Sequence, residues 1–202
     1  PKEYSYRTVE KPSWFGRYFV ILSIGRLAKE KRHEIIIEAI KKSKYSNDIQ
    51  LIIAGRGLRD NYLRDLGRSL PIEPFIGFVS HDEKLRLLNS ANLYVHASVA
   101  ELESLSSIEA LASGLPCLIS NSETSAASQF SLDNRLLFNA EDADDLAAKI
   151  NYWYEHRDEL KSPEMKKKAF QMASEYALEV SVDKYELLYS EMIEKKPSLR
   201  RR

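Results

Sequence analysis

Cysteine is nearly absent from this chain of 202 residues, whose single thiol is Cys117. One cysteine excludes an intramolecular disulfide framework and suits a reducing compartment, so we expect a cytoplasmic protein. Long apolar runs are also lacking, and none approaches the length of a membrane-spanning helix. Net charge is zero because 30 basic residues balance 30 acidic ones, which argues against attraction of nucleic acid to the whole surface.

Short apolar runs alternate with amphipathic helical patterns from about residue 18 to about residue 160. The runs are too short for helices and almost continuously apolar, which is typical of strands buried on both faces of a parallel sheet. The alternation predicts an α/β fold, a doubly wound Rossmann-like sheet with helices on both faces. We expect six strands, at residues 19–23, 50–54, 74–79, 93–97, 116–120 and 135–138.

Helix signals divide the chain further. Ser80 and Glu83 form a capping-box pattern that opens a helix at residues 82–90, and the acidic residues 141–145 begin a helix that runs through Trp153. Strand patterns stop near residue 160. We expect residues 1–16 to be a linker, 17–160 the sheet domain, 161–196 closing helices and 197–202 a basic tail.

The loops that follow strands carry the informative residues, because ligands of such sheets bind outside the carboxyl ends of the strands. After the first strand, Gly25 permits a tight turn and close approach of a ligand to the backbone. Arg26 and Lys31 follow, and two cations there could neutralise a diphosphate. The alternative interpretation is a solvated loop, since basic residues are common between strands and helices.

Two glutamates mark the loop and helix after the fourth strand. Glu101 falls in the loop, whereas Glu109 falls about one turn inside a helix that continues through Ala112. The start of that helix offers unpaired N–H groups to an anion, and a carboxylate one turn further in could accept hydrogen bonds from a ribose diol. The alternative interpretation makes both glutamates ordinary surface residues, but Glu109 lies among apolar and small residues, where a carboxylate is uncommon.

The pair Glu101 and Glu109, with Glu-Ala-Leu-Ala-Ser-Gly-Leu-Pro ending at Pro116, resembles the signature of family 4 retaining glycosyltransferases. The resemblance covers roughly residues 18–155 and implies two facing doubly wound domains that transfer a sugar from a nucleotide diphosphate without a metal. This chain would be the carboxyl-terminal, donor-binding domain, and residues 1–16 would link it to a missing amino-terminal acceptor domain. Three further loops match the same family: Gly25-Arg26 with Glu30-Lys31, Gly55-Arg56-Gly57, and Ile76-Gly77-Phe78-Val79.

The resemblance also implies roles at the matching positions. Arg26 and Lys31 would bind the diphosphate and stabilise it as leaving group, Glu109 would hold the ribose hydroxyls, and Glu101 would approach the transferred sugar. No metal or cofactor is implied, and uridine diphosphate glucose is the expected donor. Catalysis would fall to Arg26, Lys31 and Glu101. The donor-binding set would be Gly25, Arg26, Lys31, Phe78, Val79, Glu101, Ser104, Leu105, Ser106 and Glu109.

Two segments depart from the family pattern. Residues 102–106 replace a glycine-rich segment, and residues 121–130 replace a glycine pair after the fifth strand. Residues 121–130 resemble a bacterial subgroup that glucosylates membrane lipids, either diacylglycerol or a sterol. The acceptor would then be a membrane lipid or a cell-envelope glycan, and the enzyme would lie peripherally on the inner face of the membrane. The basic residues Lys41, Lys42, Lys44 and 200–202 could contact anionic lipid, although a solvated helix face and a frayed end explain them better.

Other functions fit less well. A dinucleotide-dependent dehydrogenase needs G-x-G-x-x-G after the first strand, where this chain has Gly25-Arg26-Leu27. A phosphorylase of similar architecture needs a lysine for its pyridoxal cofactor, and no motif supports one. A non-catalytic nucleotide-sugar-binding or interaction domain that keeps the fold stays open. None of the four histidines falls in a motif, and His96, in a strand, is interpreted as a core residue.

Overall fold

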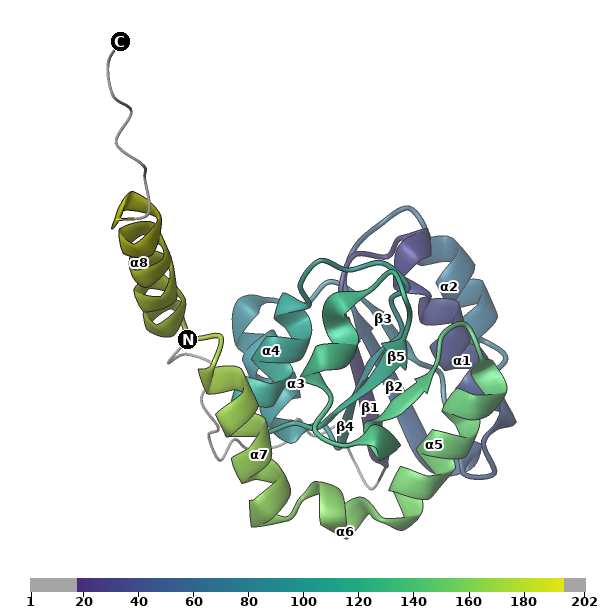
Figure 1. The fold of residues 1–202 in the computed structure, drawn as a ribbon. Coiled ribbons are helices and arrows are strands. Elements are labelled where there is room, and N and C mark those ends of the chain that lie inside the picture. The colour runs from purple at the N-terminus through teal and green to yellow at the C-terminus, as the bar shows by residue number, and fades with distance from the viewer. Residues whose placement is uncertain (1–17, 195–202) are drawn as a thin grey trace.

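A single parallel sheet organises the computed structural model, which describes residues 18–194 (Figure 1). The strand order β3-β2-β1-β4-β5-β6 puts the first strand at the centre, as in doubly wound nucleotide-binding sheets. The predicted fold class is therefore confirmed, and each of the six predicted strands overlaps a strand of the sheet. The sixth, expected at residues 135–138, begins only at Leu137, because Asn134–Leu136 form a 3₁₀ turn. The strands are β1 (Phe19–Ile24), β2 (Ile49–Ala54), β3 (Phe75–Gly77), β4 (Leu93–His96), β5 (Cys117–Asn121) and β6 (Leu137–Asn139).

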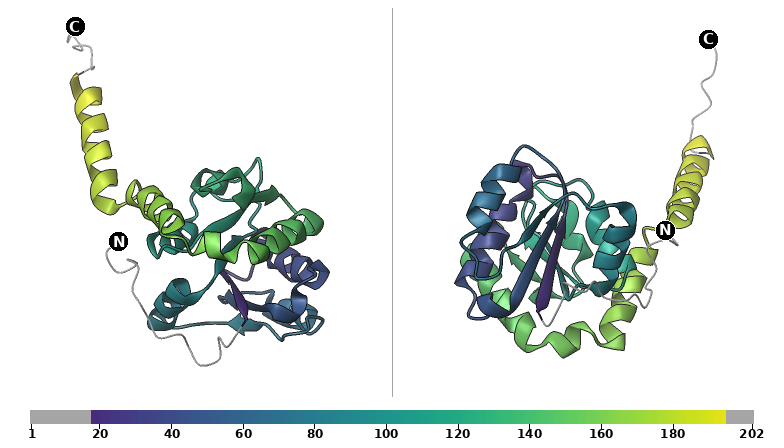
Figure 2. Two further views of the ribbon diagram at one scale, coloured as in Figure 1. Left: turned by 90° about the horizontal axis from the view of Figure 1, so that it is seen from below. Right: turned by 180° about the vertical axis from the view of Figure 1, so that it is seen from behind.

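Helices cover both faces of the sheet (Figures 1 and 2). One face carries α1 (His33–Lys42), α2 (Asp60–Gly67) and α5 (Ala143–Glu155), and the other carries α3 (His81–Ser90), α4 (Leu105–Ala112) and α7 (Pro163–Ser174). The short α6 (Arg157–Leu160) connects the two layers, and α8 (Leu178–Glu194) follows α7. Four 3₁₀ turns complete the described elements: η3 (Lys29–Lys31), η4 (Ser46–Asp48), η5 (Ala126–Phe130) and η6 (Asn134–Leu136).

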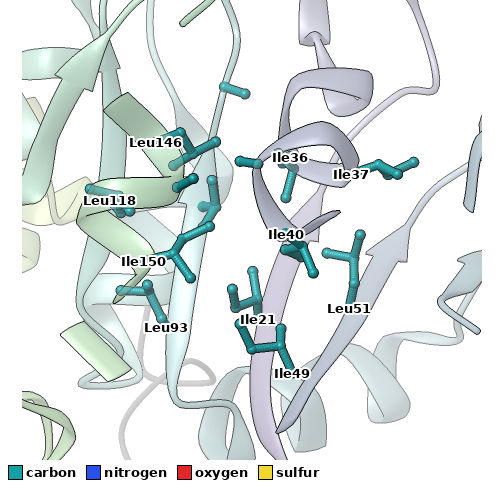
Figure 3. Packing of buried hydrophobic residues seen from close by; sticks show 14 of the residues in the cluster. Ile21, Ile36, Ile37, Ile40, Ile49, Leu51, Leu93, Leu118, Leu146 and Ile150 are labelled. Atoms are coloured by element: carbon teal, nitrogen blue, oxygen red, sulfur yellow. The ribbon is translucent and has the colours of Figure 1, made fainter. Parts of the chain in front are cut away.

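Alternate residues of the central strand feed two separate cores. Ile21 faces α1 and α5, while its neighbour Leu22 faces α3 and α4, and neither is exposed. On the first face, Ile36 and Ile40 of α1 point toward the sheet beside Ile150 of α5 (Figure 3). Burying each such side chain contributes about 1.5–3 kcal/mol. This two-sided burial is why the strands are nearly continuously apolar in sequence.

Local hydrogen bonds set where two helices begin. The predicted capping box is confirmed, since Ser80 Oγ accepts from Glu83 N (3.2 Å) and Glu83 Oε2 accepts from Ser80 N (2.8 Å). The prediction that residues 141–145 form the first turn of α5 is wrong by two residues. The carboxylate of Asp142 accepts from the N–H groups of Asp144 and Asp145 at 2.9 Å each, so Asp142 is the N-cap and α5 begins at Ala143.

The predicted third strand, at residues 74–79, is also too long. β3 spans only Phe75–Gly77 because its single neighbour, β2, ends at Ala54, the residue that pairs with Gly77. The helices α7 and α8 lie within residues 161–196, where closing helices are predicted, and α8 extends away from the rest of the molecule (Figures 1 and 2). The predicted linker at residues 1–16 and the tail at residues 197–202 lie outside the described residues.

Two observations bear on the predicted membrane contact. Within residues 18–194, no helix has both the length and the apolar character needed to cross a membrane. In the cluster Lys41, Lys42 and Lys44, two lysines form ion pairs with α5: Lys42 with Asp144 (2.7 Å) and Lys44 with Glu155 (2.6 Å). These ion pairs account for the two lysines: Lys42 links α1 to α5, and Lys44 links the segment after α1 to α5.

Glycines let the loops after β1 and β2 pack directly against each other. Gly25 N donates to Ala54 O (3.1 Å), and Gly55 N donates to Gly77 O (2.8 Å). A Cβ on Gly55 would lie 1.8 Å from the carbonyl oxygen of Gly25, whereas a Cβ on Gly25 would meet only the Lys31 side chain, at 3.8 Å. Gly25 also avoids positive φ. The fold therefore requires glycine at position 55, and the tight turn predicted at Gly25 does not require one there.

A matched pair of variants tests this difference. We expect Gly55→Ala to lower the free energy of unfolding by about 3 kcal/mol or more, because its Cβ would collide with backbone that cannot rotate away. Gly25→Ala should stay within about 0.5 kcal/mol of the wild type. Urea unfolding followed by circular dichroism measures both. Equal stability of the two variants would contradict the close approach of the loops.

Candidate functional site

Hydrogen bonds join the loops at the carboxyl edge of the sheet. Val99, after β4, donates its N–H to the carbonyl of Glu30 in the loop after β1 (3.0 Å). The carbonyl of Val99 in turn accepts from the hydroxyls of Ser122 (2.7 Å) and Thr124 (2.6 Å), which follow β5. The edge is therefore one connected surface. Ser122 and Thr124, which lie in the segment 121–130 that departs from the family pattern, are two of the residues that connect it.

An ion pair joins the loop after β1 to the loop after β4. Lys31, at the end of η3, contacts the carboxylate of Glu101, which follows β4. The two side chains are only 19% and 13% exposed, so the pair is largely removed from solvent. Burial raises the pKa of Glu101, but hydrogen bonds with His96 and Lys31 outweigh burial and hold that pKa at about 2. Glu101 is consequently an anion at any physiological pH.

Arg26 occupies a different position from Lys31. Its guanidinium pairs with Glu30 at 3.0 Å, and the side chain is 73% exposed. The two predicted diphosphate ligands are therefore each paired with a different carboxylate. The structure places both on one loop, with their charged groups in separate ion pairs.

The start of α4 lies beside the Lys31–Glu101 ion pair. Ser104 is the N-cap and α4 begins at Leu105, one residue before Ser106. The Ser104 hydroxyl bonds to the Ser107 hydroxyl (2.7 Å) in place of a backbone N–H, and Ser106 bonds to the phenol of Tyr94. The first N–H groups of a helix have no partner within the helix and carry partial positive charge. The helix start predicted to bind an anion, called the phosphate cradle from here on, has two buried serines, Ser104 and Ser107, at its base.

Glu109 lies on α4 as predicted, but its partner was not predicted. Lys84 of α3 pairs with its carboxylate at 3.0 Å, and each side chain is 20% exposed. One signal for Lys84 was present in the sequence. It lies three and four residues before Leu87 and Leu88, both buried, so it shares their apolar helix face. A lysine in an apolar stripe indicates a buried partner.

A cleft of about 380 Å³ opens beside these charges, lined in part by Gly25, Arg26, Arg56, Phe78, Val79 and Lys84. Four predicted site residues therefore line one cleft, and Lys84 connects it to Glu109. Arg56 was not predicted. Its guanidinium carbon lies 3.9 Å from the ring centroid of Phe78, a cation–π contact that holds the 59% exposed ring at the cleft.

A larger cavity, of about 570 Å³, lies between β3 and α3 and shares only Val79 with the cleft. Glu73, Phe75 and Arg86 are among the residues that line it, and neither the Lys31–Glu101 pair nor the Lys84–Glu109 pair does. We place the functional site at the smaller cleft, because the ends of β1 and β2 and three basic side chains line it, and one of these, Lys84, pairs with Glu109 of α4.

Two buried histidines lie behind the Lys31–Glu101 pair. His96, interpreted from the sequence as a core residue, is buried in β4, but its Nε2 lies 3.5 Å from Glu101 Oε1 and 3.4 Å from Ser104 Oγ. Burial, together with the charges of His96, Lys31 and Arg59, lowers the pKa of His33 to about 3, so His33 is neutral. Among residues 18–194, no three or more His, Cys, Asp or Glu side chains are grouped to hold a metal ion.

Comparison with known proteins gives relatives of one kind. An alpha-monoglucosyldiacylglycerol synthase of Acholeplasma laidlawii is 28% identical over 182 residues, which cover 88% of this chain and 44% of that protein. The catalytic domain of cholesterol-alpha-glucosyltransferase from Helicobacter pylori superposes with a TM-score of 0.70 at 35% identity, covering 78% of this chain and 99% of that domain. An Anabaena protein solved with UDP and glucose has the same fold, with a TM-score of 0.71 at 21% identity over 86% of this chain and 49% of that one.

The chain spans less than half the length of the curated relatives it matches. The resemblance to family 4 enzymes, including lipid glucosyltransferases, is confirmed by these relatives. The family described as glycosyl transferases group 1 matches residues 7–172, and with that match the chain belongs to this family.

Proposed function

We propose that this chain is the donor-binding half of a retaining glucosyltransferase that uses a nucleotide diphosphate glucose. One observation carries the proposal. Two carboxylates, Glu101 and Glu109, are each paired with a lysine from a different element. Along the chain, Glu101 precedes the N-terminus of α4 and Glu109 follows it. An anion site between two hydrogen-bond acceptors suits a molecule with a diphosphate between two polyols, which is the chemistry of a nucleotide sugar.

The geometry suggests one direction for the donor. Its base would lie in the cleft beside Phe78 and Val79, and its ribose would reach Glu109 next to Lys84. Its diphosphate would then meet the start of α4, and its sugar would meet Glu101. Uridine is the base we favour, because the Anabaena protein of the same fold was solved with UDP and glucose.

The proposed reaction is substitution at the anomeric carbon with retained configuration. As the bond between the anomeric carbon and the diphosphate breaks, negative charge grows on the departing diphosphate. The protein accelerates the reaction chiefly by positioning the reactants and by stabilising this charge. Lys31, Arg26 and the N-terminus of α4 would supply the positive charge. We propose that they do so without a metal ion.

The acceptor half would come from a separate part of the enzyme, since this chain covers less than half of its curated relatives. We propose a membrane lipid as acceptor. Two relatives support this class by their names, one a diacylglycerol glucoside synthase and the other a cholesterol glucosyltransferase. The enzyme would then act at a membrane surface, with this domain on the cytoplasmic side.

Calorimetric titration with a panel of nucleotide diphosphate sugars tests donor binding. We expect one donor to bind, and Glu109→Gln to weaken it about tenfold, which is about 1.4 kcal/mol. The sign is informative. Removing a negative charge would strengthen the binding of any anion by simple electrostatics, so weaker binding indicates lost hydrogen bonds to the ribose.

Glu103→Gln is the matched control, because Glu103 makes the same charge change in an exposed position between the two site carboxylates. It should leave the affinity unchanged or slightly higher. A folded wild-type chain that binds no donor at millimolar concentration would refute donor binding by this domain. Equal effects of Glu103→Gln and Glu109→Gln would refute the ribose assignment.

A second pair of variants tests the diphosphate. Lys31→Met should weaken UDP about tenfold by removing a charge-assisted contact. Lys29→Met, in the same turn but exposed, should change it little. Titration at low and high salt measures the electrostatic part, and identical salt dependence in both variants would contradict a diphosphate at Lys31.

Turnover provides a third test. We expect this chain alone to transfer negligible glucose from UDP-glucose to vesicles that contain diacylglycerol or cholesterol, because it lacks the proposed acceptor half. Labelled lipid product is the measurement. Transfer that Glu101→Gln abolishes would show that the acceptor site lies within this chain and would overturn the proposed division of labour.

A further inference from the structure

A line of buried polar groups connects the start of α4 to Glu101. Ser107 bonds to Ser104 (2.7 Å), the Ser104 hydroxyl lies 3.4 Å from His96 Nε2, and Nε2 lies 3.5 Å from Glu101 Oε1. His96 is 3% exposed and both serines are buried. The line therefore runs under the proposed phosphate cradle to the proposed sugar-binding carboxylate, with His96 as its link.

The direction of the hydrogen bond at Glu101 follows from chemistry. An ionised carboxylate can only accept, so Nε2 of His96 must carry the hydrogen that faces Glu101. The separation of 3.5 Å is long for such a bond. Hydrogen bonds of reactive groups are often long before the substrate binds and shorten in the complex. In this structure Lys31 contacts the same oxygen, Oε1, and holds it.

Binding of the proposed donor would change how Lys31 and His96 share the Glu101 carboxylate. A diphosphate at the start of α4 would bring negative charge to Lys31, which the proposed function assigns to it as a ligand. Lys31 would then divide its hydrogen bonds between phosphate and Glu101. The Glu101 side chain is only 13% exposed, so water cannot readily replace what it loses. Across the described part of the chain, His96 is the other side chain that contacts this carboxylate.

We propose that His96 is a positioning residue that holds the Glu101 carboxylate toward the transferred sugar once the diphosphate engages Lys31. The inference rests on the proposed function and deepens it. A buried strand position is normally apolar, and a polar side chain there needs a partner. Tyr94, which shares the face of His96, donates its hydroxyl to Ile24 O (3.1 Å). An imidazole at position 96 is explained by its partner, since its Nε2 lies 3.5 Å from Glu101 Oε1.

The test compares two variants of similar size. His96→Gln keeps an N–H donor near the place of Nε2, and His96→Met removes it. UDP and UDP-glucose are titrated into each folded variant of the 202-residue chain. We expect His96→Met to leave UDP affinity unchanged and to weaken UDP-glucose about tenfold, with most of the loss restored in His96→Gln. Thermal melting confirms that both variants are folded.

A second readout needs no nucleotide. Carboxyl ¹³C NMR should show a higher pKa for Glu101 in His96→Met than in His96→Gln, because a buried carboxylate that loses a donor is easier to protonate. An unchanged Glu101 pKa in His96→Met, or equal losses of UDP and UDP-glucose, would overturn the inference. If the wild type binds neither nucleotide but His96→Met still raises the Glu101 pKa, the proposed function fails and the His96–Glu101 contact stands.

Discussion

All six strands run in the same direction, and the rest of the structure depends on that constraint. A parallel sheet covered on both faces places every strand's carboxyl end at one edge. Apolar residues fill the two faces, so the polar side chains that need hydrogen-bonding or charged partners gather in the loops at this edge. Lys31, Glu101 and Ser122 come from loops far apart in sequence, yet they lie on one surface because β1, β4 and β5 are neighbours.

Sequence was informative wherever the cause was local. Continuous apolar runs located the strands, and the capping box at Ser80 located the start of α3, because each signal lies within a few residues. The ends of β3 and α5 were misplaced for an equally physical reason. β3 ends where its neighbour ends, and α5 begins where Asp142 caps it in competition with other acidic residues nearby. The hydrophobic pattern therefore predicts neither the end of β3 nor the start of α5.

The pairing of charges could not be predicted in the same way. The motif indicated Lys31, Glu101 and Glu109, but Lys31 and Glu101 are 70 residues apart and Lys84 and Glu109 are 25 apart. Which lysine meets which carboxylate depends on the order of strands and helices around the edge. His96 shows the limit most plainly. Its burial was predicted correctly from its strand, and its contact with Glu101 needed the loop conformation that follows that strand.

The two lysine–glutamate pairs suggest why a chain with no net charge can bind a highly charged ligand. Each pair is largely buried, and a buried charge without a partner is costly, so each lysine needs a carboxylate when the site is empty. A diphosphate offers the lysine a second anion without requiring it to leave the first, provided that the carboxylate has another donor. For Glu109 a ribose hydroxyl can serve. For Glu101 the hydroxyls of the proposed sugar would serve, together with the imidazole of His96, which already lies 3.5 Å from the carboxylate. The proposed donor would thus complete a network of charges that is balanced without it, and its binding would leave no lysine unpaired.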